Sequence, residues 1–391
     1  MHSHCINKLL NLEDVIVKNI YHSDSIITIH LDTKPTEQVC PVCGKVTSRI
    51  HDYRTQAIKD IPFQLKPVTL VLRKRRYACL CGKHFSEKYS WLPKYQHMTK
   101  RLAMYVCHQL RNTISYTYVA SQTNVSVSTV TRIFDRIQYN RPTIPKVLCI
   151  DEFKGNADTG KYQCILVDGK KKSILDILPD RKQSHLCSYF RDVPKNQRHR
   201  VEFFISDMWE PYRDIGKTFF PNATLIADKY HFIRQVTWAI ENVRKRLQRT
   251  MPVSLRKYYK HSRRLILGRY GKLKGDRKKE CDLMLLYNDD LRKAHYLKEW
   301  FYRICDEESY SVVRSEFWDW IRNAEICGIK EFEGCARTFQ NWSKEILNAF
   351  KYGFTNGPTE GNNNKIKVLK RVSYGIIKFG RFRNRILHVS R

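Results

Sequence analysis

The chain has 391 residues, of which 42% are hydrophobic, so it can bury the cores of several domains and is not a disordered tail. Its 71 Lys and Arg residues against 38 Asp and Glu residues give a net charge of +33, which is typical of a protein that binds nucleic acid. The sequence shows no apolar leader, and no apolar run reaches the roughly 18 residues of a membrane span. We therefore expect an intracellular protein that does not act at a membrane.

Two closely spaced cysteine pairs lie in the segment that we assign to an N-terminal zinc-finger domain, residues 1–90. The four residues are Cys40, Cys43, Cys79 and Cys81. A glycine follows each pair (Gly44 and Gly82) and permits the tight turn that directs backbone N–H groups at the sulfurs. Four thiolates at this spacing predict a structural zinc ion. Two alternatives stay open: His84 in place of one cysteine, or buried reduced cysteines without metal.

A run of basic residues lies between the two cysteine pairs, at positions 73–76. Within it, Arg75 and Arg76 are candidate contacts to DNA phosphates. The alternative is a solvated strand end, because charge runs are common on exposed surfaces.

Residues 116–134 have the layout of a helix-turn-helix, inside a DNA-binding domain that we place at residues 91–142. Ala120 allows close approach of two helices, and Asn124 tolerates a left-handed turn between them. Either Ser126 or Ser128 can cap the second helix. The expected shared core consists of Val119, Val125, Val130, Ile133 and Phe134. The second helix would present to the major groove Ser128, Thr129, Thr131 and Arg132. An ordinary helical hairpin is the alternative.

Beyond residue 142 the pattern changes from helix to strand. Short apolar runs at 147–150, 163–167, 173–178, 201–205 and 224–227 predict the strands of the first part of a catalytic core, residues 143–237. Residues 238–350 have almost continuous helical spacing and are assigned to a separate helical domain. The last segment, 351–391, holds a Gly/Pro/Asn break followed by one more helix, which we assign to the catalytic core.

Three carboxylates stand where the predicted elements end or begin. Asp151 and Asp207 each follow a predicted strand, and Glu360 lies early in the final helix. Side chains at such positions can converge at one edge of a sheet. Three hard oxygen donors there suit two Mg²⁺ ions, or Mn²⁺ in their place, about 4 Å apart, as in enzymes that cut phosphodiesters. The alternative is helix caps and surface charges.

Other acidic residues nearby are interpreted differently. Asp228 also follows a strand and is a weaker candidate for metal. Glu152, Asp168 and Asp176 are expected to be solvated strand or turn residues, and His231 a structural histidine.

Basic residues are concentrated in two regions. Residues 244–279 contain fifteen Lys and Arg against one acidic residue, and residues 361–391 contain nine and none. In the final helix, Lys367, Lys370 and Arg371 are candidate DNA contacts, with Lys367 and Arg371 on the same face as Glu360. We expect both regions to line the path of the DNA.

The motifs around the acidic residues carry a family resemblance. They read IDEF at 150–153, ISDMWEPY at 205–212, ADKYH at 227–231, and EGNN at 360–363 with KR at 370–371. In this order they resemble the DDE transposases of bacterial insertion sequences, most closely the ISL-three family, over essentially the whole chain. The tight C-x-C pair is the one departure from the family pattern.

The resemblance implies a multidomain α/β protein. Its RNase H-like catalytic core would carry a helical insertion and follow a zinc-binding module and a helix-turn-helix. It also implies that Asp151, Asp207 and Glu360 form the catalytic triad, and that Asp228 belongs to a structural strand–helix motif.

The function expected from these observations is DNA transposition. The protein would bind the terminal inverted repeats of its element and then cleave and transfer DNA strands to target DNA with Mg²⁺. A dimer or higher oligomer on DNA is expected, since two ends must be joined, in the bacterial cytoplasm at the nucleoid. Two alternatives stay open: a catalytically silent DNA-binding regulator derived from a transposase, and an RNase H-like nuclease of structured DNA.

Overall fold

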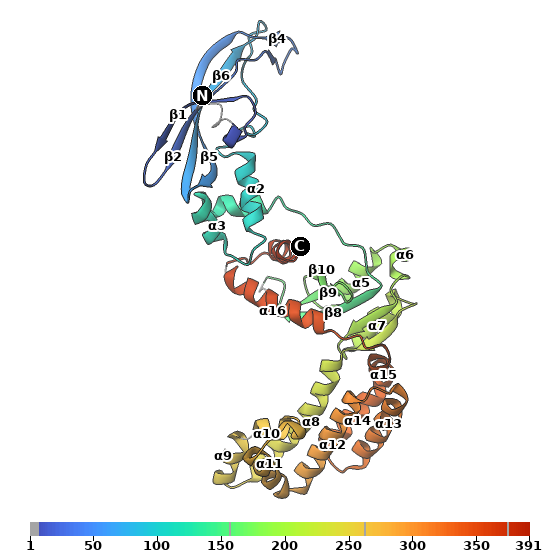
Figure 1. Cartoon of the computed structure of the whole chain (residues 1–391). Helices are drawn as coiled ribbons and strands as arrows, with labels where there is room; N and C mark the ends of the chain where they lie inside the picture. The colour runs from blue at the N-terminus through green and yellow to red at the C-terminus, as the bar shows by residue number, and fades with distance from the viewer. Residues whose placement is uncertain (1–7, 156–157, 262, 374) are drawn as a thin grey trace. The chain divides into compact units, whose positions relative to one another are not determined.

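The computed structural model describes residues 8–155, 158–261, 263–373 and 375–391 (Figure 1). The chain divides into two compact units. One comprises the described residues up to Tyr139 with Lys367–Ile376 and Gly380–Arg391, and the other comprises Asn140–Ile366 with Ile377–Phe379. Each unit is described by itself.

The first unit begins with a mixed five-stranded sheet. Its strands are β1 (Val15–His22), β2 (Ile27–Thr33), β5 (Ile50–Phe63), β6 (Lys66–Ala78) and β7 (His84–Ser86). The order is β1-β2-β6-β5, with β7 paired to β6. Strand β2 alternates buried and half-buried residues, the period of two expected of a strand with one face on a core. Two short strands, β3 (Gln38–Val39) and β4 (Val46–Thr47), form a separate hairpin.

Three helices follow this sheet: α2 (Lys100–Gln109), α3 (Tyr116–Thr123) and α4 (Val127–Phe134). The five predicted core residues of the helix-turn-helix are all buried and pack with Leu102, Val106 and Leu110 of the α2 region. Asn124 ends α3 in the left-handed conformation, with φ of 51°, and Ser126 caps α4 by accepting a hydrogen bond from the Thr129 N–H. The predicted helix-turn-helix geometry is therefore confirmed.

The second unit contains another five-stranded sheet. Its strands are β8 (Val147–Lys154), β9 (Tyr162–Asp168), β10 (Ser173–Leu178), β11 (Phe203–Ser206) and β12 (Thr224–Ala227), and their order is β10-β9-β8-β11-β12. The first three strands are antiparallel, whereas β8, β11 and β12 are parallel. Helices α5 (Gln183–Arg191), α6 (Lys195–Arg198) and α7 (Glu210–Phe219) connect the later strands, and α5 and α7 share a core with β8, β9 and β11.

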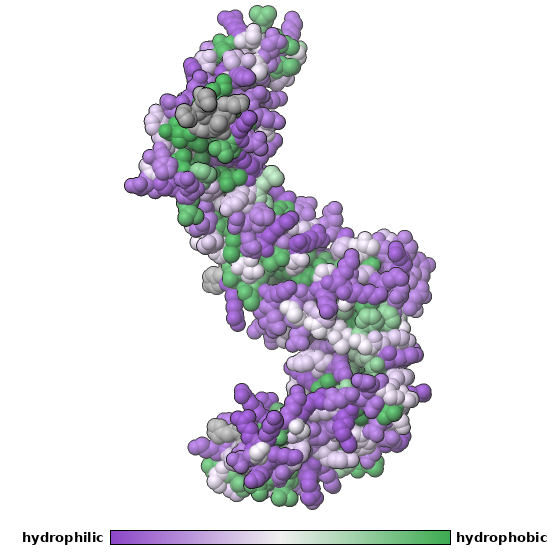
Figure 2. Space-filling view, viewed as in Figure 1, coloured by the Kyte–Doolittle hydropathy of each residue, from purple (hydrophilic) through white to green (hydrophobic). Residues whose placement is uncertain are grey.

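A group of helices follows β12. They are α8 (Lys229–Thr250), α9 (Val253–His261), α10 (Arg263–Leu267), α11 (Asp276–Leu286), α12 (Asp289–Asp306), α13 (Tyr310–Ile326), α14 (Lys330–Asn341) and α15 (Ser343–Tyr352), with a 3-10 turn at Tyr270–Lys272. Large aromatic side chains such as Phe301, Trp320 and Phe339 fill their core. The visible face of these helices is mostly hydrophilic (Figure 2).

Two helices close the chain, α16 (Gly357–Val372) and α17 (Phe379–Val389). Helix α16 contributes residues to both units, and α17 from Gly380 onward belongs to the first. Among the described residues, no helix combines the length and the apolar character that a membrane crossing requires.

Candidate active site and DNA-binding elements

The two aspartates predicted to be catalytic lie at the same edge of the second sheet. Strands β8 and β11 are parallel neighbours, and Ile205 pairs with Cys149. Asp151 lies within β8 and Asp207 directly follows β11, each two residues beyond this pair, so the strand register brings the two side chains side by side where β11 ends. The sequence placed Asp151 at the end of its strand, whereas β8 continues to Lys154 because it also pairs with β9 over this stretch. The Oδ1 atom of Asp207 is buried and has no hydrogen-bond partner among the described residues. A buried, unpartnered carboxylate oxygen is suited to a cation.

Burial raises the pKa of both carboxyl groups. The pKa of Asp151 rises to about 6, chiefly through burial, and the charges of Asp228 and Glu152 add to the increase. The pKa of Asp207 rises to about 7 for the same main reason, with contributions from the charges of Asp151 and Glu152. His231 lowers both pKa values but does not cancel the effect of burial. Raised carboxyl pKa values of this kind are common at functional sites, where acidic side chains bind a cation or transfer a proton.

These shifts predict how stability depends on pH. Because the folded pKa of Asp207 lies above its usual 3.8, the stabilisation from its proton is complete below about pH 4 and is lost as the pH rises through about 7. In Mg²⁺-free buffer we expect the Tm to fall between pH 5 and 8, and to fall less in Asp207→Asn. Differential scanning fluorimetry tests this, and equal pH profiles for the two proteins would contradict it.

The start of helix α16 is tied to this sheet edge. The Asn356 side chain donates a hydrogen bond to the carbonyl of Ile150, 3.1 Å away, and its backbone N–H donates to Asp228 at 2.8 Å. About two helical turns further on, the Asn363 amide donates to Asp151 Oδ2 at 3.0 Å. The sequence interpretation missed both asparagines as site residues. For Asn363, the run Asn362–Asn364 was a usable sequence signal, because asparagine is unfavourable inside a helix and three in a row indicate that their side chains make specific contacts.

Glu360 lies on the same helix, in its first turn, and is exposed. Within the described ranges, the four cysteines form the one group of three or more potential ligands whose atoms lie mutually within 4.8 Å. The structure therefore brings Asp151 and Asp207 to one edge of the sheet. Glu360 lies on the helix anchored at that edge, but its carboxylate does not form a tight group with the two aspartates.

The other acidic residues have structural partners. Asp228 accepts from Asn356 and lies 3.1 Å from His231 Nδ1, as the interpretation of a structural motif predicted. Glu152 accepts two hydrogen bonds of 2.7 Å from Arg181. Asp168 and Asp176 are only 6% and 2% exposed, so the expectation that they are solvated is wrong. Their oxygens accept hydrogen bonds from nearby backbone N–H groups, which makes their burial tolerable.

The four predicted zinc ligands come together. Their sulfur atoms lie within 4.8 Å of one another, with 3.6 Å between Cys40 and Cys81 and 3.4 Å between Cys43 and Cys79. Gly44 and Gly82 have φ of 73° and 84°, the left-handed turns that the sequence predicted. The backbone N–H of Cys43 lowers the pKa of the Cys40 thiol to about 6. His84 is not in the group, and its ring lies against that of His51 in a tilted arrangement, with 4.0 Å between the ring centroids.

The two predicted DNA contacts in the basic run on β6 form ion pairs within the protein. Arg75 is 3% exposed and pairs with Asp32 at 2.8 Å and Glu87 at 3.3 Å. It stabilises the first sheet and cannot reach DNA, so the sequence prediction for Arg75 is corrected. Arg76 is half-buried and pairs with Asp52 at 3.0 Å, which leaves it a weak candidate.

Helix α4 exposes two of the four predicted DNA-reading side chains fully and the other two in part. Ser128 and Arg132 are exposed, and Thr129 and Thr131 are half-buried. The Thr131 hydroxyl donates to the carbonyl of Val127 within its own helix. The face as a whole remains available to a DNA groove.

The two basic regions are only partly free for DNA. In the first, Arg244 and Arg263 pair with Glu241, and Arg246 pairs with Asp290 and Glu331. In the final helices, Lys367 and Arg371 are exposed and Lys370 is half-buried. Some of the basic residues that the sequence assigned to DNA binding are therefore paired with acidic residues of the protein itself.

Helix α17 is held against the helix-turn-helix by a buried arginine that the sequence interpretation did not single out. The Arg385 side chain is 0% exposed and donates to the carbonyls of Leu110, Asn112 and Ile114, at 2.9 and 2.8 Å for the last two. Burial lowers its pKa to about 10. His388 adds contacts to the Tyr139 hydroxyl at 2.6 Å and the Cys107 carbonyl at 2.7 Å. Helix α17 is thus a fourth helix of the DNA-binding module.

We expect Arg385→Met to loosen this module. Removing the guanidinium leaves buried carbonyls without a donor, which costs about 2–3 kcal/mol. Hydrogen exchange in α2 and α17 should then be about 30- to 150-fold faster, while β8 and β9 are unchanged. The half-buried Arg383 supplies the control, and Arg383→Met should change exchange by less than about fivefold. Equal exchange in both variants would contradict the assigned role.

Comparisons with known proteins match three segments of the chain. A family model described as a transposase matches residues 148–386, which is more than half of the chain. A model described as the zinc-finger of transposase IS204/IS1001/IS1096/IS1165 matches residues 36–81, and one described as the helix-turn-helix domain of transposase family ISL3 matches residues 87–138. The chain belongs to the ISL3 transposase family.

Curated proteins give one extended match. The transposase for insertion sequence element IS1001 of Bordetella parapertussis is 27% identical over 364 residues, which cover 89% of this chain and 88% of that protein. A protein named ATP-dependent protease, from Lactococcus lactis subsp. lactis, is 45% identical over 56 residues, only 14% of this chain and 18% of its own length. The short match carries no argument about the whole transposase.

The sequence prediction of an insertion-sequence transposase is therefore confirmed. It is an enzyme of transposition that binds DNA, and its four-cysteine group is the zinc site of a zinc-ribbon module.

Proposed function

We propose that this transposase cuts DNA at the ends of its element and joins the freed ends to target DNA. The proposed organisation is a zinc-finger domain at 1–90, a helix-turn-helix domain at 91–142, a catalytic core at 143–237 and 351–391, and a helical insertion at 238–350. Helix α17 at the end of the last segment is the exception, because from Gly380 onward it packs with the helix-turn-helix. The observation that carries the proposal is the pair Asp151 and Asp207 at the same level of the neighbouring parallel strands β8 and β11, where β11 ends, with α16 anchored beside them.

The catalytic core is proposed to be RNase H-like. The strand order β10-β9-β8-β11-β12, with an antiparallel half and a parallel half, supports this assignment. The insertion at 238–350 would consist of α8 from residue 238 onward, α9 to α14 and most of α15, since these helices separate the last strand from α16 along the chain.

Asp151, Asp207 and Glu360 would hold Mg²⁺, and Mn²⁺ would suit the same oxygen donors. Two such ions, when bound, activate water and stabilise the leaving oxygen of a phosphodiester. The residues fit this role in their chemistry, because Oδ1 of Asp207 is unpartnered and the pKa values of both carboxyl groups stay raised by burial even with His231 nearby. Glu360 is exposed on its helix, so its carboxylate is free to turn toward the two aspartates.

Neighbouring residues would keep the acidic side chains in place. Asn363 holds one oxygen of Asp151 and thereby fixes the direction of the other. Asn356 fixes the start of α16 against β8 and thereby the position of Glu360 relative to the two aspartates.

The reaction proposed has two displacements at phosphorus. In the first, a water oxygen bonds to the phosphorus, the bond to the 3′ oxygen breaks, and a 3′-OH and a 5′-phosphate result. In the second, that 3′-OH attacks a phosphodiester of target DNA and releases a new 3′-OH there. No Tyr or Ser nucleophile is required.

DNA would be recognised by the first unit. Zinc ribbon and helix-turn-helix together would bind the terminal inverted repeats, with Ser128, Thr129, Thr131 and Arg132 facing the major groove. We propose Lys367, Lys370 and Arg371 as further DNA contacts. Joining two ends requires at least two copies, so a dimer or higher oligomer on DNA is proposed, acting in the cytoplasm at the nucleoid.

The test is cleavage of a supercoiled plasmid that carries the two element ends, with Mg²⁺ present. Wild type should nick or cut at the ends, while Asp151→Asn and Glu360→Gln should bind the same DNA with unchanged affinity and cut nothing. Cleavage by both variants at wild-type rate would refute the assigned residues.

A further inference from the structure

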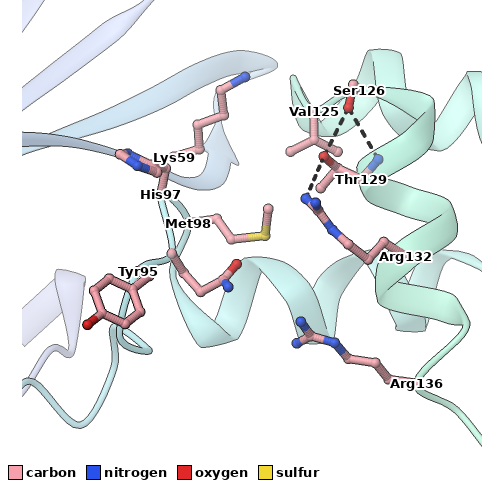
Figure 3. Close-up of a pocket in the computed structure, with 10 residues that line it drawn as sticks. Lys59, Tyr95, His97, Met98, Val125, Ser126, Thr129, Arg132 and Arg136 are labelled. Atoms are coloured by element: carbon pink, nitrogen blue, oxygen red, sulfur yellow. Dashed lines mark hydrogen bonds between the residues drawn. The ribbon is translucent and has the colours of Figure 1, made fainter.

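A continuous basic trough lies beside helix α4 in the first unit. It consists of three adjoining hollows. The first lies between α4 and the segment 95–98, the second between α4 and the start of α2, and the third further along α2. Thr129 and Arg132 line the first two hollows, and Arg136 lines all three. Figure 3 shows Arg132 and Arg136 extending into the first hollow, across from Lys59 and Met98.

The charge of this trough is entirely of one sign. The lysines and arginines that line it are Lys59, Lys100, Arg111, Arg132 and Arg136, and no acidic residue is among the lining residues of the three hollows. All five are exposed. Within the described part of the chain, no carboxylate lies within 4.0 Å of the Arg132 or Arg136 guanidinium.

The acidic residues closest in sequence are already paired elsewhere. Asp135 accepts two hydrogen bonds of 2.7 Å from Arg381 of α17. Asp60 is buried and accepts from Thr99 at 2.7 Å and from Arg101. The positive charge of the trough is therefore not neutralised by the protein itself, and an anion is the natural ligand.

The walls of the trough are fixed before any ligand arrives. The Lys59 N–H donates to the His97 carbonyl at 2.9 Å, and the Lys59 carbonyl accepts from the Thr99 N–H at 3.0 Å. The Lys59 ammonium donates across the trough to the carbonyl of Asn124, the turn residue before α4. One residue of β5 thus binds both walls, so the spacing of the charges is preorganised.

We propose that the basic trough holds the sugar–phosphate backbone of one DNA strand while α4 reads the adjoining groove. A trough lined by several cations along its length suits a repeating phosphate backbone better than a single small anion. The trough also shares Thr129 and Arg132 with the DNA-reading face of α4. The exposed side chains Tyr95 and Met104, 82% and 71% accessible, offer apolar surface to the sugars. This inference rests on the proposed recognition of element ends by α4, and it adds residues from β5, α2 and the segment 95–98.

The test is binding of two duplexes by the full-length protein as a function of salt. One duplex carries the terminal repeat of the element and the other a scrambled sequence of equal composition, and fluorescence anisotropy reports both affinities. The variants are Lys100→Gln, Arg111→Gln and Arg136→Gln. Lys18→Gln on β1, an exposed lysine outside the trough, is the matched control, and Tm and zinc content confirm folding.

Each trough variant should weaken binding to both duplexes by the same factor, about three- to tenfold at 0.1 M salt. Each should also lower the slope of log K against log salt by about 0.9. Lys18→Gln should change neither quantity. Slopes equal to wild type in the folded trough variants would overturn the proposal. If wild type does not prefer the element end but the slopes still fall, end recognition by α4 fails while the trough stands.

Discussion

Asp207→Asn should lower the rate of end cleavage by about 1000-fold and leave the fold intact. The substitution keeps the shape of the side chain but removes the negative charge that would hold a cation, and losses of this size follow removal of an essential electrostatic group. Because burial disfavours the ionised form of Asp207, the variant should melt at or above the wild-type temperature at pH 8. Single-turnover cleavage of an end duplex and a thermal melt measure the two effects.

The matched control is Asp214→Asn, on the exposed side of helix α7 only seven residues away. It should cut at a rate within about twofold of wild type, as expected for a surface substitution. An Asp207→Asn protein that cuts normally, or one that is inactive only because its Tm has fallen, would contradict the role assigned to Asp207.

Cys79→Ser should abolish zinc binding and unfold the zinc ribbon. The four sulfurs lie at the junction of two turns with no large hydrophobic core of their own, so the metal supplies most of the local stability. Structural zinc contributes about 10–16 kcal/mol in small zinc-finger peptides, far more than the β3–β4 hairpin can replace. We expect zinc content to fall from one ion per chain to none, with new protease cleavage between residues 36 and 86.

Cys187→Ser, at a half-buried cysteine of α5, is the control for this experiment. It should keep one zinc ion per chain and the wild-type protease pattern. A Cys79→Ser protein that retains stoichiometric zinc would show that another residue completes the site, and His84 would then have to be reconsidered.

Local sequence signals predicted the two small modules well. Paired cysteines followed by glycines specify their own turns, and the φ values of Gly44 and Gly82 agree. The helix-turn-helix is likewise encoded by neighbours in sequence: Asn124 supplies the left-handed turn and Ser126 the cap. In both cases the residues that determine the structure lie within a few positions of each other.

Predictions failed where a partner far away in sequence decides the environment. The sequence indicated that Arg75 is a solvated cation available to DNA. In the structure it is paired with Asp32 and Glu87, which come to lie beside it only through the folding of the sheet. Arg385 belonged to a basic stretch, yet it is buried against carbonyls more than 270 residues earlier. Composition cannot distinguish a basic residue that faces DNA from one that is paired or buried inside the protein.

The candidate active site lies between these cases. Asp151 and Asp207 could be predicted because each follows a run of apolar strand residues, and parallel pairing of β8 and β11 brings them side by side, although β8 continues past Asp151 to Lys154. The roles of Asn356 and Asn363 could not, since their partners are the β8 residues Ile150 and Asp151, more than 200 positions away.

The most direct test of a shared metal site at Asp151, Asp207 and Glu360 is oxidative cleavage of the polypeptide by Fe²⁺ bound in place of Mg²⁺. With ascorbate and peroxide, iron cuts the backbone beside its ligands, and mass spectrometry locates the cuts without any need for DNA cleavage. We expect cuts at three places, near residues 151, 207 and 360, all suppressed by excess Mg²⁺ and absent in Asp207→Asn. Cuts near 151 and 207 with none near 360, or cuts that persist in Asp207→Asn, would contradict the proposed site.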